Sequence, residues 1–190
     1  RLPLPNMANM SGKVVLITGG ASGIGAEVAR RLHAKGANLI LTDLDGAALA
    51  ETAGRLGGSR VLTVVADVRD AAAMAGAVAQ AVDRFGGIDV VLANAGIGSF
   101  GSTRNIDPEA FKRVIDVNVT GVFNTVHAAL PALVQRRGYV LMVSSLAAFV
   151  AGPGMAAYTA SKAAVENLAN ALRLEVAHLG VDVGSAHMSW

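Results

Sequence analysis

The chain has 190 residues, of which 53% are hydrophobic and only 16% charged. This composition supports one buried core and excludes global disorder. Its 16 basic and 14 acidic residues are interspersed and leave a net charge of +2, so the sequence predicts neither a nucleic-acid site nor binding to a membrane; without cysteine it also has no disulfide, thiol nucleophile or thiolate metal site.

The first ten residues differ in composition from the rest of the chain. Residues 1–10, RLPLPNMANM, contain no long apolar segment, and we interpret them as a leader or a cloning remnant. One domain is then expected over residues 11–190. No uninterrupted apolar run reaches the ~18 residues that a membrane span needs, and we expect a cytoplasmic location.

Six short apolar runs alternate with longer helical patterns along the chain. Runs of this kind, without polar alternation, are typical of parallel strands covered on both faces, and the intervening segments are long enough for crossover helices. The sequence therefore predicts an α/β fold, a single doubly wound Rossmann-type domain with a mainly parallel sheet in the order 3-2-1-4-5-6. The predicted strands span residues 13–18, 38–42, 61–65, 88–93, 139–144 and 181–186.

A glycine-rich turn, TGGASGIG at residues 18–25, joins the first strand to the first helix. Glycine permits a sharp turn and close approach of the backbone to a diphosphate, which the free N–H groups at the helix N-terminus then bind. Glycines in a strand-to-helix turn can also serve the turn alone. The predicted cofactor-binding residues of this turn are Gly19, Ser22, Gly23, Ile24 and Gly25.

Asp43 ends the second strand, 18 residues beyond Gly25. A carboxylate near this offset accepts hydrogen bonds from the adenosine ribose and repels a 2′-phosphate. No basic residue stands at Ser22 or Leu44 to attract that phosphate. The predicted cofactor is therefore NAD rather than NADP. Asp43 can alternatively be read as a helix N-cap, a role for which Asp45 is the more natural candidate.

The segments 108–137 and 155–179 are predicted helices with apolar residues around much of their circumference. A helix that covers one sheet face needs only one apolar stripe. We therefore expect a homodimer or homotetramer formed through these two helices. The alternative is that they are large central helices of a monomer.

Tyr158 and Lys162 lie four residues apart in AAYTASKAA, and so share one face of the second of these helices. A tyrosine ordinarily has a pKa of ~10, and a nearby ammonium stabilises the phenolate. Tyr158 can then act as general base toward an alcohol or as general acid toward a ketone. The same spacing is also frequent on solvated helices, where it carries no chemistry.

Several motifs occur together in the order of one known family. The glycine turn has the form T-G-x-x-x-G-x-G, Asn94 to Gly96 read NAG after the fourth strand, and Ser145 precedes Tyr158 by thirteen residues. With Asn118 and the Y-x-x-x-K pair, this set resembles the short-chain dehydrogenase/reductase family over nearly the whole chain.

The resemblance implies roles for individual residues. Ser145 would hydrogen-bond the reacting oxygen, Lys162 would also bind the nicotinamide ribose, and Asn118 would hold a water in a proton relay. Further cofactor contacts are implied for Asp67 and Val68 near the adenine and for Asn94 and Gly96. The implied activity is hydride transfer between NAD(H) and a small-molecule secondary alcohol or ketone, with Asn118, Ser145, Tyr158 and Lys162 as catalytic residues.

Two positions depart from the family pattern. Ala93 replaces the first Asn of the usual Asn-Asn-Ala-Gly, and the last predicted strand runs into AHMSW where many relatives have His-Pro-Gly. Relatives continue into a substrate-covering helical loop and a seventh strand, so the resemblance implies that the C-terminal part is missing. The expected substrate residues are Ser145, Phe149 and Met155, with Phe100, Leu146 and Trp190 beside them; apolar side chains here favour a lipophilic substrate or merely pack.

Other functions fit the sequence less well. The four histidines are scattered, and no metal site is predicted. A hydrolase is disfavoured because no G-x-S-x-G motif is present. The remaining rival is a sensor or scaffold of the same fold that binds NAD(H) without turnover, a role that does not require all four catalytic residues together.

Overall fold

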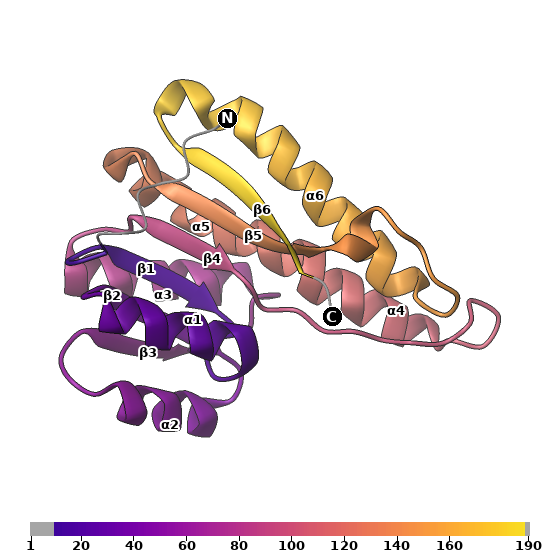
Figure 1. Ribbon diagram of the computed structural model, residues 1–190, viewed down its shortest axis with the longest axis horizontal. Coiled ribbons are helices and arrows are strands. Elements are labelled where there is room, and N and C mark those ends of the chain that lie inside the picture. Colours follow the sequence, from indigo (N-terminus) through magenta and orange to yellow (C-terminus); the bar gives the residue numbers. More distant parts are fainter. Residues whose placement is uncertain (1–9, 189–190) are drawn as a thin grey trace.

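The computed structural model describes residues 10–188 and shows one parallel six-stranded sheet with the strand order β3-β2-β1-β4-β5-β6 (Figure 1). The predicted doubly wound fold, its strand order and all six predicted strands are confirmed, with bounds that differ by at most two residues. The strands are β1 (Val14–Thr18), β2 (Asn38–Asp43), β3 (Val61–Val65), β4 (Val90–Ala93), β5 (Tyr139–Ser145) and β6 (Asp182–Met188).

Helices connect each strand to the next. Three of them begin at an aspartate whose carboxylate accepts hydrogen bonds from N–H groups of the first turn, the usual N-cap arrangement. Asp45 caps α2 in this way, as predicted, and Asp70 and Asp107 cap α3 and α4. The helices are α1 (Gly23–Ala34), α2 (Gly46–Leu56), α3 (Ala71–Phe85), α4 (Pro108–Ile115), α5 (Gly121–Arg136) and α6 (Ala156–Val176).

Two apolar clusters cover the two faces of the sheet. Alternate residues of a strand point to opposite faces, and Leu16 joins the cluster under α3, α5 and α6 while its neighbours Val15 and Ile17 join the cluster under α1 and α2. All three side chains are fully buried. Met10, placed in the leader by the sequence prediction, packs in the second cluster; the rest of that predicted leader lies outside the described residues.

The predicted continuous helix over 108–137 is corrected by the structure. A π-helical turn, Asp116–Thr120, separates α4 from α5, and the N–H of Gly121 donates to the carbonyl of Asp116. One extra residue in a turn rotates the side chains that follow, and such turns are frequent at functional sites. Asn118 lies in this turn with only 1% of its surface exposed, so the irregular turn directs a polar side chain inward.

The helical stretch Pro108–Arg136 contains an 18-residue window with a mean hydropathy of 1.3, which meets the length and composition of a membrane span. Half of that apolar window is buried within the molecule, against the sheet and α3. Burial of this kind is also found in the core helices of globular domains, so the hydropathy alone identifies no membrane segment.

Candidate active site

The glycine turn lies at the carboxyl end of β1, beside the point where the strand order reverses between β1 and β4. Gly19 has a φ of +66°, a conformation that other residues rarely adopt, and a Cβ on Gly25 would overlap the carbonyl oxygen of Gly19. The Asn94 side chain holds the turn, because its Nδ2 donates to the carbonyls of Thr18 at 2.9 Å and Gly19 at 3.3 Å. The backbone is thus shaped for close approach of a ligand to the N-terminus of α1.

Asp43 fastens the same turn to β2. Its Oδ2 accepts a hydrogen bond from the N–H of Ala21 at 3.2 Å, and its Oδ1 accepts one from the N–H of Asp45 at 3.3 Å. The carboxylate also lines the cleft described below, with lone pairs left for a ligand. The alternative interpretation of Asp43 as the N-cap of α2 is wrong, because Asp45 makes that bond.

Asp67 follows β3 and meets the side chain of Arg69. Arg69 donates to both carboxylate oxygens, with Nε 2.9 Å from Oδ2, and these bonds lower the pKa of Asp67. Because the Arg69 guanidinium stabilises the charged form, Asp67 presents an ionised carboxylate to the cleft.

Lys162 lies on α6 with 6% of its surface exposed, and its Nζ donates to the carbonyl of Val143 at 2.8 Å. Burial disfavours the charged form and lowers its pKa from 10.5 to about 8. The ammonium lies 5.6 Å from the centre of the Tyr158 ring, as i, i+4 spacing predicts. A buried cation is therefore held next to a phenol.

Asn118 joins three segments. Its Oδ1 accepts from the N–H of Ile97 at 2.8 Å, while its Nδ2 donates to the carbonyl of Ile97 at 2.9 Å and to Oγ of Ser161 at 3.0 Å. Ser145 ends β5, and its hydroxyl donates to the carbonyl of Met188 at 3.3 Å and accepts from the N–H of Ala147. The Ser145 hydroxyl must therefore rotate away from the carbonyl of Met188 before it can donate to another oxygen.

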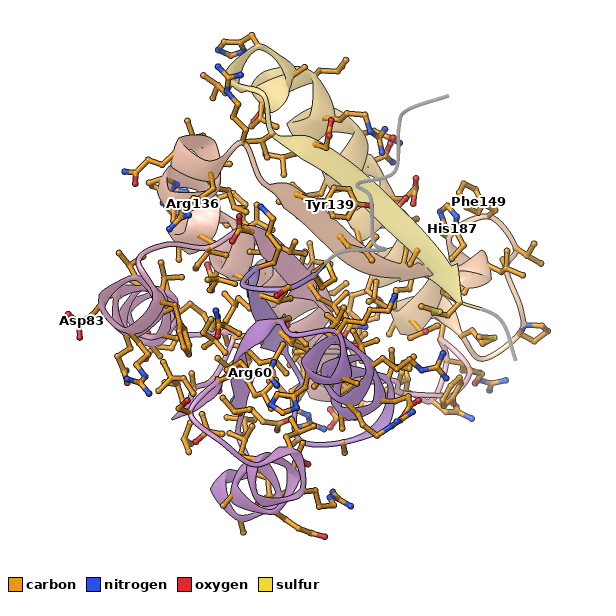
Figure 2. All side chains as sticks on the ribbon, turned by 60° about the vertical axis from the view of Figure 1, so that its left-hand side comes forward. Arg60, Asp83, Arg136, Tyr139, Phe149 and His187 are labelled. Atoms are coloured by element: carbon orange, nitrogen blue, oxygen red, sulfur yellow. The ribbon has the colours of Figure 1, made fainter. Side chains whose placement is uncertain are left out.

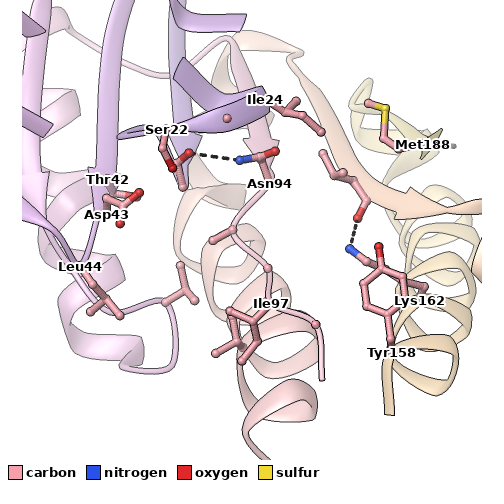
Figure 3. Close-up of a pocket in the computed structure, with 18 of the residues that line it drawn as sticks. Ser22, Ile24, Thr42, Asp43, Leu44, Asn94, Ile97, Tyr158, Lys162 and Met188 are labelled. Carbon is pink, nitrogen blue, oxygen red and sulfur yellow. Dashed lines mark hydrogen bonds between the residues drawn. The ribbon is translucent and has the colours of Figure 1, made fainter. Parts of the chain in front are cut away.

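A cleft of about 590 Å³ connects the glycine turn to Tyr158 and Lys162 (Figure 3). Every predicted cofactor residue lines this cleft except Gly25, which packs against the carbonyl of Gly19. Phe100 also lines it, and its ring centre is 6.4 Å from that of Tyr158. Asn118 and Ser145 flank the cleft without lining it. The predicted residues on its wall are Gly19, Ser22, Gly23, Ile24, Asp43, Asp67, Val68, Asn94, Gly96, Tyr158 and Lys162.

Two expected substrate residues lie apart from the cleft. Phe149 packs edge-on against His187, with ring centres 5.1 Å apart, in the region that Figure 2 shows near the end of β6. Met155 immediately precedes α6. Neither lines the cleft wall, and Trp190 lies outside the described residues. The apolar lining on this side comes from Phe100, as expected, together with Ile97 and Met188, and Leu146 is not among the lining residues.

Sequence reasoning missed the contacts of three residues, Thr18, Ser161 and His187. Thr18 Oγ1 accepts from the backbone N–H groups of Asn94 and Ala95, and Ser161 bonds Asn118. His187 Nε2 lies 2.7 Å from Oε2 of Glu166, one turn beyond Lys162. Each joins segments far apart in the chain, so no local spacing could have indicated it. No metal-binding group of His, Cys, Asp or Glu occurs within residues 10–188.

The comparisons with known proteins agree with this geometry. The model of the short chain dehydrogenase family matches residues 13–188. The oxidoreductase UcpA of Salmonella typhimurium is 40% identical over 183 residues, which cover 94% of this chain and 69% of the relative. The trans-4-hydroxycyclohexanecarboxylate dehydrogenase of Sinomonas cyclohexanicum is 37% identical over 183 residues, covering 92% and 71%.

The fold of the chain is also similar to that of a solved structure. The 3-ketoacyl-(acyl-carrier-protein) reductase of Brucella melitensis, complexed with NADH, superposes with a TM-score of 0.90 at 33% identity and covers 94% of this chain and 76% of its own. Fold, motif order and sequence identity agree over the same residues. The chain therefore belongs to the short-chain dehydrogenase/reductase family of oxidoreductases.

Proposed function

We propose that this protein is an NAD-dependent dehydrogenase that interconverts secondary alcohols and ketones, with Tyr158 as the general acid/base. The observation that carries the proposal is the single cleft in which the glycine turn and Asp43 stand at one end and Tyr158 and Lys162 at the other. A protein that only bound a dinucleotide could use the buried Lys162 ammonium to hold a ribose, but it would have no use for the Tyr158 phenol beside that ammonium.

The cleft fits a nicotinamide dinucleotide. A Cβ on Gly23, the first residue of α1, would meet nothing within 4 Å, so the N-terminus of this helix is open to a diphosphate, and a Cβ on Gly96 would lie 3.7 Å from Lys162 Nζ. Asp43 would hold the adenosine ribose, and Lys162 the nicotinamide ribose. When bound, the nicotinamide supplies the hydride acceptor or donor.

The residues of the chain supply the proton chemistry. In alcohol oxidation, deprotonated Tyr158 would take the proton of the substrate hydroxyl while a hydride leaves the carbon that bears this hydroxyl, and a ketone forms. In reduction Tyr158 donates that proton to the carbonyl oxygen. Below pH 8 the Lys162 ammonium stabilises the phenolate, and Ser145 orients the substrate oxygen by rotating its hydroxyl away from Met188.

The choice of NAD rests on Asp43. Its carboxylate repels a 2′-phosphate, and among the described residues of the cleft wall the only basic one is Lys162, at the opposite end. Titration of the protein with NADH and NADPH, followed by cofactor fluorescence, tests this choice. We expect NADH to bind at least about tenfold more tightly, and Asp43→Ser to reduce the difference. Tighter NADPH binding by the unaltered protein would contradict the assignment.

The substrate class rests on the apolar side chains near Tyr158. Phe100, Ile97 and Met188 line the cleft and are 64%, 42% and 39% exposed, so a ligand in the cleft would cover apolar surface. We therefore infer a lipophilic alcohol or ketone. NAD+ reduction followed at 340 nm with a panel of cyclic, aliphatic, sugar and charged secondary alcohols tests both activity and class. Turnover of sugars or charged alcohols alone would refute the lipophilic assignment, and no turnover of any member would refute the activity.

We also propose self-association through α5 and α6. These helices enclose a surface groove of about 160 Å³, and Phe123 at its edge is half-exposed and stacks on His127. Apolar grooves of this kind are buried when two copies pair. Sedimentation velocity should show a dimer or tetramer that Phe123→Asp dissociates, whereas Phe111→Asp, a partly exposed phenylalanine of α4 outside the groove, should not. A monomeric unaltered protein would exclude the proposal.

A further inference from the structure

Ser161 lies on α6 directly before Lys162, and its surface is completely buried. Its hydroxyl donates to the carbonyl of Tyr158 at 2.7 Å and accepts from Asn118 Nδ2 at 3.0 Å. It does not line the cleft. Ser161 thus contacts two residues of the proposed catalytic set without reaching the place where a substrate would react.

The directions of these hydrogen bonds are fixed by chemistry. A carbonyl only accepts, so the single proton of Ser161 goes to Tyr158, and the oxygen must accept from the amide of Asn118. The N–H of Ile97 only donates, so Oδ1 of Asn118 must face it. Both ends require the same amide orientation, and both Nδ2 hydrogens have an acceptor, one on Ile97 and one on Ser161.

The bond connects the cofactor side of the cleft to the catalytic helix. Ile97 and Gly96 belong to the segment after β4 that lines the cleft. A Cβ on Gly96 would lie 3.3 Å from Asn118 Oδ1 and 3.7 Å from Lys162 Nζ, so this segment lies directly against both side chains. Asn118 holds the segment, and Ser161 is the point at which Asn118 is attached to α6.

Packing by itself does not explain why residue 161 carries a hydroxyl. Its neighbours in AAYTASKAA are mostly alanines, and an alanine would fill this buried site on a helix without a polar group to satisfy. Burying a hydroxyl costs free energy unless it forms hydrogen bonds, and here it forms two. The polar group is therefore explained by the partners that it joins.

We propose that Ser161 is a positioning residue of the dehydrogenase: by fixing the Asn118 amide, it holds the 94–97 segment at a set distance from Tyr158 and Lys162. The inference rests on the proposed function, because positioning has a kinetic consequence only in an enzyme. It predicts that loss of the hydroxyl slows the chemical step much more than it weakens binding of cofactor or substrate.

Ser161→Ala tests the proposal against a matched control, Thr159→Val. Thr159 also donates to carbonyls of α6, those of Met155 and Ala156, but it makes no bond to Asn118. We expect Ser161→Ala to lower kcat at least about tenfold while KM and the Kd of NADH change by less than about threefold. Thr159→Val should keep kcat within about twofold.

Two further measurements separate positioning from general destabilisation. In a double-mutant cycle, Ser161→Ala should have little additional effect on kcat in an Asn118→Ala background, because the effect passes through Asn118. In the cofactor-free protein, hydrogen exchange of the Asn118 side-chain NH2, assigned by NMR with Asn118→Asp, should become at least about tenfold faster in Ser161→Ala. Ser161→Cys replaces the hydroxyl by a somewhat larger thiol that is only a weak donor and acceptor, and it should lower kcat in a protein that remains folded.

Each outcome decides one question. Unchanged kcat in Ser161→Ala or in a folded Ser161→Cys, or additive effects in the cycle, would overturn the positioning role while leaving the dehydrogenase assignment intact. Unchanged exchange of the Asn118 amide would overturn it even in a protein without turnover. An unaltered protein that neither binds NADH nor turns over any alcohol would instead refute the proposed function.

Discussion

The two halves of the sheet contribute to the cleft in different ways. Around β1, β2 and β3 the site is made mainly of backbone: a glycine turn, a helix N-terminus, and two carboxylates, Asp43 and Asp67, that themselves bind backbone N–H groups. Around β4, β5 and β6 it is made mainly of side chains. Val117 comes from the π-helical turn, Tyr158 and Lys162 come from α6, and the segment after β4 and the end of β6 add Ile97, Phe100 and Met188. The first half suits a ligand with fixed shape, the second a reaction that moves a proton. Binding and turnover should therefore be separable by mutation.

The largest difference between the effect on turnover and the effect on cofactor binding is expected from Tyr158→Phe. Removing the phenol oxygen leaves no group to exchange the substrate proton, so kcat should fall by about 10³-fold, while the Kd of NADH stays within about threefold. Stopped-flow kinetics and fluorescence titration measure the two quantities. The same change at the only other tyrosine, Tyr139→Phe on β5, is the control and should leave kcat nearly unaltered. Substantial turnover by Tyr158→Phe would remove Tyr158 from the mechanism.

The opposite separation is expected from Gly25→Ala. The added Cβ would overlap the carbonyl of Gly19, so the turn must move away from the shape that admits a diphosphate. We expect at least about 100-fold weaker NADH binding and a lower Tm. Gly76→Ala is the control, since a Cβ on that glycine of α3 meets nothing within 4 Å and alanine favours a helix. NADH affinity equal in both variants would mean that the turn does not bind the cofactor.

A smaller effect is expected where the two halves meet. Thr18 of β1 is buried and accepts from the N–H groups of Asn94 and Ala95 beyond β4, so Thr18→Val leaves two donors without an acceptor and should lower the free energy of unfolding by about 2–4 kcal/mol. Its neighbour across the β1–β2 pair, Thr42, is equally buried, but its hydroxyl has no partner among the described residues. Thr42→Val should therefore cost nothing or stabilise. Urea unfolding measures both, and equal losses would contradict the account.

The sequence predicted the halves unequally well, for physical reasons. Strands, glycine turn, Asp43 and the Tyr158–Lys162 pair depend on local spacing, and all lie where expected. The π-helical turn did not show in the sequence, because one extra residue in an apolar helix hardly alters its periodicity. The bond from Ser161 to Asn118 spans 43 residues and depends on how two helices pack. Phe149 and Met155 are apolar and near Ser145 in sequence, but proximity in sequence did not place them on the cleft wall.

The smallest expected effect is the pH dependence of stability that Lys162 causes; above pH 10.0 Tyr139, whose pKa is raised by burial, acts in the opposite direction. Its pKa is about 8 in the folded protein and 10.5 in a solvated lysine, so between these values the unfolded chain binds more protons than the folded one. The free energy of unfolding must then rise with pH from about 8 to 10.5, by on the order of 2 kcal/mol, as the cost of burying the charge is relieved.

Lys162→Met should remove this rise and make the cofactor-free protein more stable below pH 8, because methionine fills the site without a charge to desolvate. Lys112→Met is the control, since Lys112 pairs with Asp116 at the surface and the pKa of Lys112 is raised, beyond the window. Urea unfolding at intervals from pH 7 to 10.5 measures the slopes. A rise that persists in Lys162→Met would assign it to another group and leave the Lys162 ammonium without the burial cost that its place beside Tyr158 implies. A rise that disappears together with turnover would show that the half of the sheet that performs the chemistry is also the half that is held at a cost in stability.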